Sequence, residues 1–349
     1  MTVVVVGAGI LGASVAYHLA CRDVPVTLVE QGAGPAPGVT ADSFAWIGGT
    51  TGGNWPGGAE DLRPAVLADW RRLEREVPGV TVRRTGSLTW PVPYGPGAGR
   101  LSGDRHPVGR AAIQTLEPHF RTPPDAAVHT PSDAGVDPVA VTAALVRAAR
   151  ARGARVGYGA AGVALRTDTG RVTGVDTAAG FRPASAVVLA AGTGVVELAA
   201  PLGITLPVTG SPARLLRLAA PPGLVRSVVA GPDFEVREVS KGRLLLTHTK
   251  ANDETAVAAL RTAFEGEFRV LGSRVGVRPV PAAGPLIGPL TPDGSAYLAV
   301  AHSAVTLAPT VGRLVAAELA TGRPAPELGR CRVAPSGPGR GPGPLRVSG

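Results

Sequence analysis

Cysteine, lysine and long apolar runs are scarce in this chain of 349 residues. Its two cysteines, Cys21 and Cys331, lie far apart and outside any CxxC pair, which excludes a disulfide framework and a zinc site of the usual spacing. No segment reaches the roughly eighteen uninterrupted apolar residues that a membrane-spanning helix needs. The first residues lack the charged leader and cleavage site of a signal peptide. We therefore expect a soluble, cytoplasmic protein without a membrane partner.

The charge balance is basic, with 35 Lys and Arg against 26 Asp and Glu and a net charge of +9. Lys241 and Lys250 are the only lysines, and the tail from Arg323 onward carries five arginines against Glu327 alone. The other arginines are scattered, and no window alternates aromatic and basic residues as a base-stacking surface does. Nucleic acid is therefore not an expected partner.

What the sequence does contain is a βαβ pattern near its start. Residues 3–6 are four valines, which is typical of a strand buried on both faces of a parallel sheet. The pattern then predicts a helix over 10–20 and a second buried strand over 26–29. Further helices are predicted over 65–76, 138–152 and 310–321, and strands over 186–190 and 298–301. Pro309 is expected in the first turn of the last helix, and Gly322 just beyond its end.

Two stretches, 81–130 and about 207–249, alternate apolar and polar residues and are interrupted by Pro and Gly. This pattern predicts antiparallel strands, which we interpret as a second, inserted domain. The expected division is 1–80, 131–206 and 272–325 for the first domain and 81–130 and 207–271 for the inserted one. The Pro-, Gly- and Arg-rich segment 326–349 is too poor in apolar residues to offset the entropy of ordering and is predicted to be a disordered tail.

The turn after the first strand has the spacing of a dinucleotide-binding loop. Gly7 would make the tight bend, Gly9 would allow a pyrophosphate to approach the backbone, and Gly12 would allow the helix to pack on the strand. Glu30, at the end of the next strand, could accept both hydroxyls of an adenosine ribose and would repel the extra phosphate of NADP. The alternative for Glu30 is a solvated strand end, and the βαβ unit alone does not distinguish FAD from NAD.

With 48 glycines, the same spacing arises by chance about once in a chain of this composition. It does occur again at Gly157, Gly159 and Gly162, where an apolar β-like segment follows instead of a helix. We assign this second match to chance.

Later segments carry a family resemblance. They read VEQGAGPAPGVTADSFAWIGG, DWRRLERE, DAGVDPVAVTAAL, VVLAAGTGV, GVRPVPAAGPLIGPL and AVAHSAVTLAPTVGRLVAAEL. In this order the chain resembles, from about residue 1 to 325, the glycine oxidase and sarcosine oxidase branch of the D-amino-acid oxidase family. The resemblance implies an α/β fold with a discontinuous, Rossmann-like FAD-binding domain and an inserted antiparallel β-sheet domain that covers the flavin.

The resemblance also implies site residues. Arg278 would pair with a substrate carboxylate, although a surface salt bridge is the alternative. His302, which could equally be a core histidine, precedes a helix whose first amides would face the flavin. Arg278 and His302 are the catalytic candidates that the resemblance implies. For a flavin mechanism we add two hypotheses: His248, on a predicted strand, could line the pocket, and Lys250 or Lys241 could supply the cation that assists reaction with oxygen. The implied cofactor-binding residues are Gly7, Gly9, Ile10, Leu11, Gly12, Glu30, Gln31, Thr40, Asp42, Ser43, Val163, Ala191, Gly192, Arg278, Ser303, Thr306 and Leu307.

Several positions depart from the family pattern. Ala282 and Ala283 replace a carboxylate, Ala304 replaces a glycine, and 209–214 lacks an Arg-Gly pair. These departures leave the substrate open. Neither cysteine is placed like the family's flavin-linking residue, so we expect dissociable FAD.

The implied reaction is oxidation of a C–N bond in a small amino acid or amine by hydride transfer to flavin N5, giving an imine, with reoxidation by oxygen. Two alternatives are a dehydrogenase that passes electrons to a quinone or another carrier in a tailoring pathway, and a flavin-binding protein without catalysis.

Overall fold

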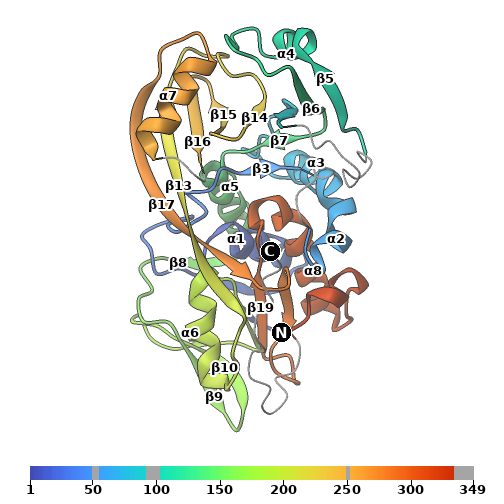
Figure 1. Ribbon diagram of the computed structural model, residues 1–349. Helices are drawn as coiled ribbons and strands as arrows, with labels where there is room; N and C mark the ends of the chain where they lie inside the picture. The colour runs from blue at the N-terminus through green and yellow to red at the C-terminus, as the bar shows by residue number, and fades with distance from the viewer. Residues whose placement is uncertain (49–54, 92–102, 249–251, 334–349) are drawn as a thin grey trace, which may run out of the picture.

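Two large β-sheets, connected by two long strands, organise the chain (Figure 1). The structure, a computed structural model, describes residues 1–48, 55–91, 103–248 and 252–333. In Figure 1, β13 and β17 run from the eight-stranded sheet in the upper half of the molecule down to the region of α6 (Val195–Ala199). The functional residues discussed below lie where the two sheets approach one another.

The first sheet has six strands, of which five are parallel and the edge strand β18 is antiparallel. In sheet order they are β18 (Leu286–Pro289), β19 (Ala296–Val300), β12 (Ala186–Leu189), β1 (Val3–Val6), β2 (Val26–Val29) and β8 (Arg155–Gly157). The four valines of β1 explain its central place. Val3 and Val5 belong to one hydrophobic core and Val4 and Val6 to another, so both faces of the strand are buried.

Helices cover one face of this sheet. α1 (Ile10–Ala20) packs against α5 (Pro138–Ala151) and α8 (Ala304–Thr321), and α3 (Val66–Glu76) packs on α8. The helix pair α1–α8 is close because Gly312 leaves no room for a side chain beside Ser14, whose hydroxyl donates to Ala308 O at 2.7 Å. Asp137 begins α5 by accepting hydrogen bonds from Val139 N and Ala140 N, each 3.0 Å long.

The opposite face is covered by a small antiparallel sheet of β9 (Ala164–Asp168), β10 (Arg171–Asp176) and β11 (Arg182–Pro183). Val172 and Val175 of β10 are fully buried in the core that contains Val4 and Val6. The parallel sheet is therefore the central layer of three.

The eight-stranded sheet is antiparallel except where β14 pairs in parallel with β4. In sheet order its strands are β17 (Arg269–Pro281), β13 (Val208–Ala219), β16 (Arg243–Thr247), β15 (Glu235–Ser240), β14 (Val228–Ala230), β4 (Ser87–Thr89), β6 (Ala126–Thr130) and β5 (His106–Gly109). α4 (Arg110–Leu116) and α7 (Asp253–Ala263) contribute residues to its apolar core. β17 crosses residue 272, where the sequence suggested a domain boundary.

The remaining short elements connect these layers. In the described part of the chain they are β3 (Trp46–Ile47), β7 (Ala134–Gly135), α2 (Ala59–Leu62) and four 3₁₀ turns. β3 and β7 pair with one another beside the N-terminal half of α8. Lys241 and Gly242 form the β15–β16 hairpin turn.

The last helix begins earlier than expected, at Ala304 instead of residue 310, so Pro309 lies inside α8 and not in its first turn. Pro309 has no N–H to donate to the Val305 carbonyl. Tertiary contacts hold the turn instead, since Trp70 Nε1 donates to Thr306 O at 2.9 Å and Ser14 donates to Ala308 O. Gly322 ends the helix in the left-handed region, φ 69°, as predicted.

The expected tail also starts too early. Residues Pro326–Cys331 form a 3₁₀ helix in which Leu328 and Cys331 are fully buried. Arg332 pairs with Glu318 of α8. Two apolar anchors and an ion pair thus order the chain as far as residue 333, while 334–349 lie outside the described residues.

Candidate functional site

The glycine turn between β1 and α1 has the conformation that its sequence predicts. Gly7 has φ 103°, a region that disfavours other residues, and donates to Val29 O at 2.8 Å. A Cβ on Gly12 would lie 1.9 Å from Gly7 O, so this position tolerates only glycine. A Cβ on Gly9 would lie 3.2 Å from Thr40 Oγ1. The second match, at Gly157, Gly159 and Gly162, opens no helix.

Glu30 lies beside this turn and is buried, with 6% of its surface exposed. Its carboxylate accepts hydrogen bonds from Ala8 N at 2.7 Å and Gly32 N at 2.9 Å. Each carboxylate oxygen retains a second lone-pair direction for a further donor. Glu30 is therefore a positioned acceptor and not a solvated strand end.

The loop after β2 folds back over the start of α1. Thr40 Oγ1 accepts from Ile10 N at 3.2 Å, and Ala36 N donates to Ala8 O. Asp42 is also buried, but its carboxylate pairs with Arg217 and Arg274, both at 3.3 Å. Asp42 thus ties the loop to strands β13 and β17.

These pieces meet at the carboxyl edge of the parallel sheet. β1 continues to β2 on one side, while β12 and β19 lie on its other side, so the strand order reverses between β1 and β12. Ligands of open α/β sheets bind in the crevice at such a switch point. Ala191 and Gly192 follow β12 there, and a Cβ on Gly7 would lie 2.9 Å from Ala191 Cα. Val163 and Ala191 both pack on the core that contains Val6.

A cavity of about 380 Å³ begins at the N-terminus of α1 and extends under the eight-stranded sheet. Several predicted residues line it, namely Ile10, Thr40, Asp42, Ser43, His248, Arg278, His302, Ser303 and Thr306. Among the described residues, the others of the predicted set do not line it; these are Gly7, Gly9, Leu11, Gly12, Glu30, Gln31, Val163, Ala191, Gly192 and Leu307. The structure thus separates the predicted set into a turn region and a cavity region joined at Ile10 and Thr40.

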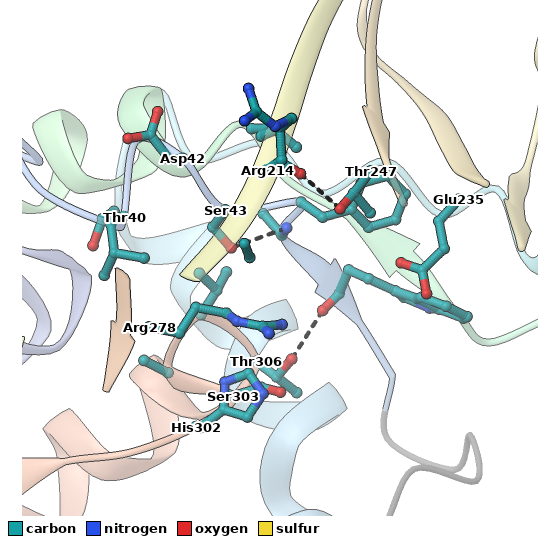
Figure 2. Close-up of a pocket in the computed structure, with 18 of the residues that line it drawn as sticks. Thr40, Asp42, Ser43, Arg214, Glu235, Thr247, Arg278, His302, Ser303 and Thr306 are labelled. Atoms are coloured by element: carbon teal, nitrogen blue, oxygen red, sulfur yellow. Dashed lines mark hydrogen bonds between the residues drawn. The ribbon is translucent and has the colours of Figure 1, made fainter. Parts of the chain in front are cut away.

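Arg278 comes to the cavity from β17, and Figure 2 shows its guanidinium directed inward. Nη2 donates to Ser211 Oγ at 3.0 Å, on the paired strand. Nε is buried without a hydrogen-bond partner, and no described carboxylate forms an ion pair with Arg278. Since buried donors are nearly always satisfied, this guanidinium retains capacity to bind an acceptor.

His302 and the first turn of α8 form the opposite side of the cavity. The imidazole can be reached from the cavity, while partial burial and the charge of Arg278 lower its pKa. Ser303 is the N-cap residue of the 18-residue helix. Thr306 Oγ1 donates to Trp46 O at 2.9 Å, and the amide of Leu307 donates to Ser303 O at 3.2 Å. The positive end of the α8 dipole therefore faces the cavity.

His248 lines the cavity just beyond β16, yet its imidazole is engaged elsewhere. Its Nε2 lies 3.1 Å from Asp253 Oδ1, and Arg214 Nε lies 3.3 Å from the same carboxylate oxygen. Figure 2 shows the Arg214 side chain directed away from the cavity. Lys250 lies outside the described residues.

The sequence reasoning missed Glu235 and Arg237 of β15. Glu235 lines the cavity, and burial raises the pKa of its carboxyl group while Arg278 opposes this rise. Arg237 is 2% exposed and donates to Phe44 O and Val136 O, each at 2.6 Å. The sequence did contain an indication of both residues. Glu235 and Arg237 are charged and lie at alternate positions of an expected strand, and alternate residues share one face of a sheet.

The family model described as DAO, FAD dependent oxidoreductase, matches residues 2–318. The chain belongs to the DAO family of FAD-dependent oxidoreductases. Among curated proteins it is similar to the uncharacterized oxidoreductase YurR of Bacillus subtilis (strain 168), with 28% identity over 91% of this chain and 93% of YurR.

Solved structures with the same fold include DAO-family amino acid oxidases. Glycine oxidase from Bacillus cereus ATCC 14579 superimposes with a TM-score of 0.79 at 19% identity, covering 92% of this chain and 95% of the other. Iminodiacetate oxidase from Chelativorans sp. BNC1 gives a TM-score of 0.76 at 23% identity, covering 95% and 98%. The fold is therefore the mixed α/β fold of this family, with a Rossmann-type FAD-binding domain.

The described residues fit the FAD of this DAO-family protein. A side chain at Gly7 or Gly12 would collide with neighbouring backbone atoms, so the backbone of this turn is free of side chains. Glu30 lies beside the turn as a fixed hydrogen-bond acceptor. Within the described ranges, we find neither a cluster of three metal-ligating side chains nor a helix that meets the length and hydropathy of a bilayer span.

Proposed function

We propose that this DAO-family protein oxidises a C–N bond of a small amino acid or amine whose carboxylate pairs with Arg278. The observation that carries the proposal is the guanidinium of Arg278, directed into the cavity with Nε free and with no described carboxylate in an ion pair. A planar guanidinium binds a carboxylate through two parallel hydrogen bonds. A substrate carboxylate would thus supply the charge that the protein leaves unmatched.

Bound FAD supplies the acceptor for the hydride that leaves the substrate carbon. The protein contributes orientation and electrostatics. Arg278 fixes one end of the substrate, and the N-terminus of α8 at Ser303 favours negative charge beside it. His302, whose lowered pKa keeps its imidazole neutral near pH 7, can accept the proton that leaves the nitrogen. Loss of a hydride from carbon and a proton from nitrogen gives an imine, which water hydrolyses.

We propose that the FAD is held without a covalent bond. The turn at Gly7, Gly9 and Gly12 would hold the pyrophosphate and Glu30 the ribose. Cys21 caps the far end of α1, about 17 Å from the turn for a helix of 11 residues. Cys331 is buried in the core between α2 and the last 3₁₀ helix, and neither cysteine lines the cavity. Release of the flavin by denaturation, with a colourless protein pellet, is the expected result.

The names of structural neighbours support an amino-acid substrate. They include glycine oxidase, iminodiacetate oxidase and L-amino acid deaminase from Proteus vulgaris. The deaminase structure, in which the specific insertion sequence is deleted, has a TM-score of 0.81 at 20% identity, and the match covers 95% of this chain and 92% of that one. Each of these substrates carries a carboxylate next to the C–N bond.

The test is an anaerobic absorbance screen of the purified holoenzyme with D- and L-amino acids, N-methyl amino acids and cyclic imino acids. The proposal expects at least one carboxylate-bearing compound to bleach the flavin. Bleaching only by amines without a carboxylate, or by no compound, would contradict it. Admitting oxygen to the reduced protein in an oxygen electrode then distinguishes an oxidase from a dehydrogenase that needs a quinone or another carrier.

A further inference from the structure

The cavity holds a carboxyl group that the proposed reaction does not use. Glu235 begins β15 and is half-buried, and no described side chain forms a hydrogen bond or ion pair with its carboxyl group. Asp42, the other acidic residue of the lining, is matched by Arg217 and Arg274. Glu235 is therefore the acidic lining residue, within the described part, that is left to interact with a ligand.

The strand register places Glu235 and Arg278 on one face of the eight-stranded sheet. Glu235 lies opposite Thr247, Thr247 lies opposite Leu215, and Arg278 lies opposite Ser211, four residues before Leu215. Directly opposed residues share a face, and residues separated by an even number along a strand do so too. Figure 2 shows both charged groups directed into the same space.

Arg278 and Glu235 form no ion pair with one another, although the charge of the guanidinium acts on the carboxyl group. Strands β13 and β16 lie between β17 and β15, so three spacings of about 4.8 Å, or about 14 Å, separate the strands that carry Arg278 and Glu235. The positive Arg278 and the negative Glu235 thus face the same cavity from two different strands of the sheet, β17 and β15. A ligand that satisfies both must carry a carboxylate and, several bonds away, a cation or a strong hydrogen-bond donor.

We propose that Glu235 determines substrate specificity, and that the substrate is an amino acid with a basic side chain or an equivalent distal amine. Its carboxylate binds Arg278 and its distal cation binds Glu235. This inference rests on the proposed function, since it takes Arg278 as the carboxylate-binding residue. Burial of Glu235 supports it, because burial raises the pKa of the carboxyl group and the charge of Arg278 offsets this rise only in part, so that a bound cation would further stabilise the charged form.

The test measures dissociation constants from the flavin difference spectrum of the anaerobic holoenzyme, mixed rapidly with ornithine or norvaline, and with lysine or norleucine, each as both enantiomers. We expect the basic member of at least one pair to bind about tenfold or more tightly than its apolar partner. In Glu235→Gln this preference should disappear. Asp233→Asn removes the same charge from an exposed position two residues away and should retain it.

Equal affinity within every pair for the wild-type protein would overturn the inference, and so would a preference that persists in Glu235→Gln. If Glu235→Gln fails to retain FAD, the wild-type comparison alone decides. A different result would contradict the proposed function itself. In that case, no amino acid of either kind perturbs or bleaches the flavin of the wild-type protein.

Discussion

Glu30, at the end of β2, accepts a 2.7 Å hydrogen bond from the amide of Ala8, the residue after the first glycine of the turn. Its other carboxylate oxygen accepts from Gly32 N. One buried side chain therefore fixes the position of the turn and of the loop that follows β2. This arrangement joins the two parts of the chain that a dinucleotide must contact.

The Glu30→Gln substitution should weaken both stability and FAD binding. A glutamine offers one acceptor oxygen, and its amide group would oppose either the Ala8 or the Gly32 N–H. We expect a loss of about 1–3 kcal/mol in the free energy of unfolding and about a tenfold or greater rise in the Kd for FAD. Denaturant unfolding of the FAD-free protein and fluorescence titration with FAD measure the two effects. Glu265→Gln, at an exposed residue, is the control and should change neither.

Alanine substitution should be far more damaging in the first GxGxxG match, at Gly12, than in the second, at Gly157. In Gly12→Ala the new Cβ would collide with Gly7 O, so we expect at least about 1–3 kcal/mol of destabilisation and loss of bound FAD. Gly157→Ala meets no atom within 4 Å and should stay within about 0.5 kcal/mol of the parent protein. Thermal unfolding and the flavin-to-protein absorbance ratio provide the comparison. Equal effects would mean that the assignment of the turn is wrong.

Arg278→Lys should affect recognition of the carboxylate more than folding. Lysine keeps the charge but cannot form two parallel hydrogen bonds with a carboxylate. We expect KM for a carboxylate-bearing substrate to rise about tenfold or more, with a smaller change in kcat, in steady-state assays on the substrate found by the screen. Arg269→Lys, at an exposed position of the same strand, is the control. An unchanged KM in Arg278→Lys would remove Arg278 from the substrate site.

His18 should make the protein sensitive to acid. Burial, together with the charges of Arg72 and Arg22, lowers the pKa of its imidazole from 6.5 to about 4, although the hydrogen bond between Nδ1 and Ser14 O opposes this shift. Between these values the unfolded chain binds more protons than the folded one, so stability falls as the pH drops from about 6.5 to 4. The loss is of the order of 3 kcal/mol. Urea unfolding across this range should show the slope in the parent protein and a flatter profile in His18→Phe.

The sequence was most informative where a short segment carries its own burial pattern. Val3 to Val6 need two apolar faces, and Gly7 needs a conformation that few residues tolerate, so strand and turn follow from local chemistry. The predicted start and end of α1, residues 10 and 20, agree with the structure, because they too follow from a local pattern of residues. Pro309 misled the prediction of α8, because its missing hydrogen bond is compensated by Trp70 and Ser14 from other helices.

The amino-acid sequence by itself determined the βαβ core, the glycine turn with its acidic partner and the order of segments shared with the DAO family. These features depend on residues close together in the chain. Only the tertiary structure decided that Asp42 is bound by Arg217 and Arg274, that residues 326–333 are ordered, and that Glu235 and Arg278 face one cavity. The register of strands far apart in sequence brings these charges together, and no local pattern of residues encodes that register.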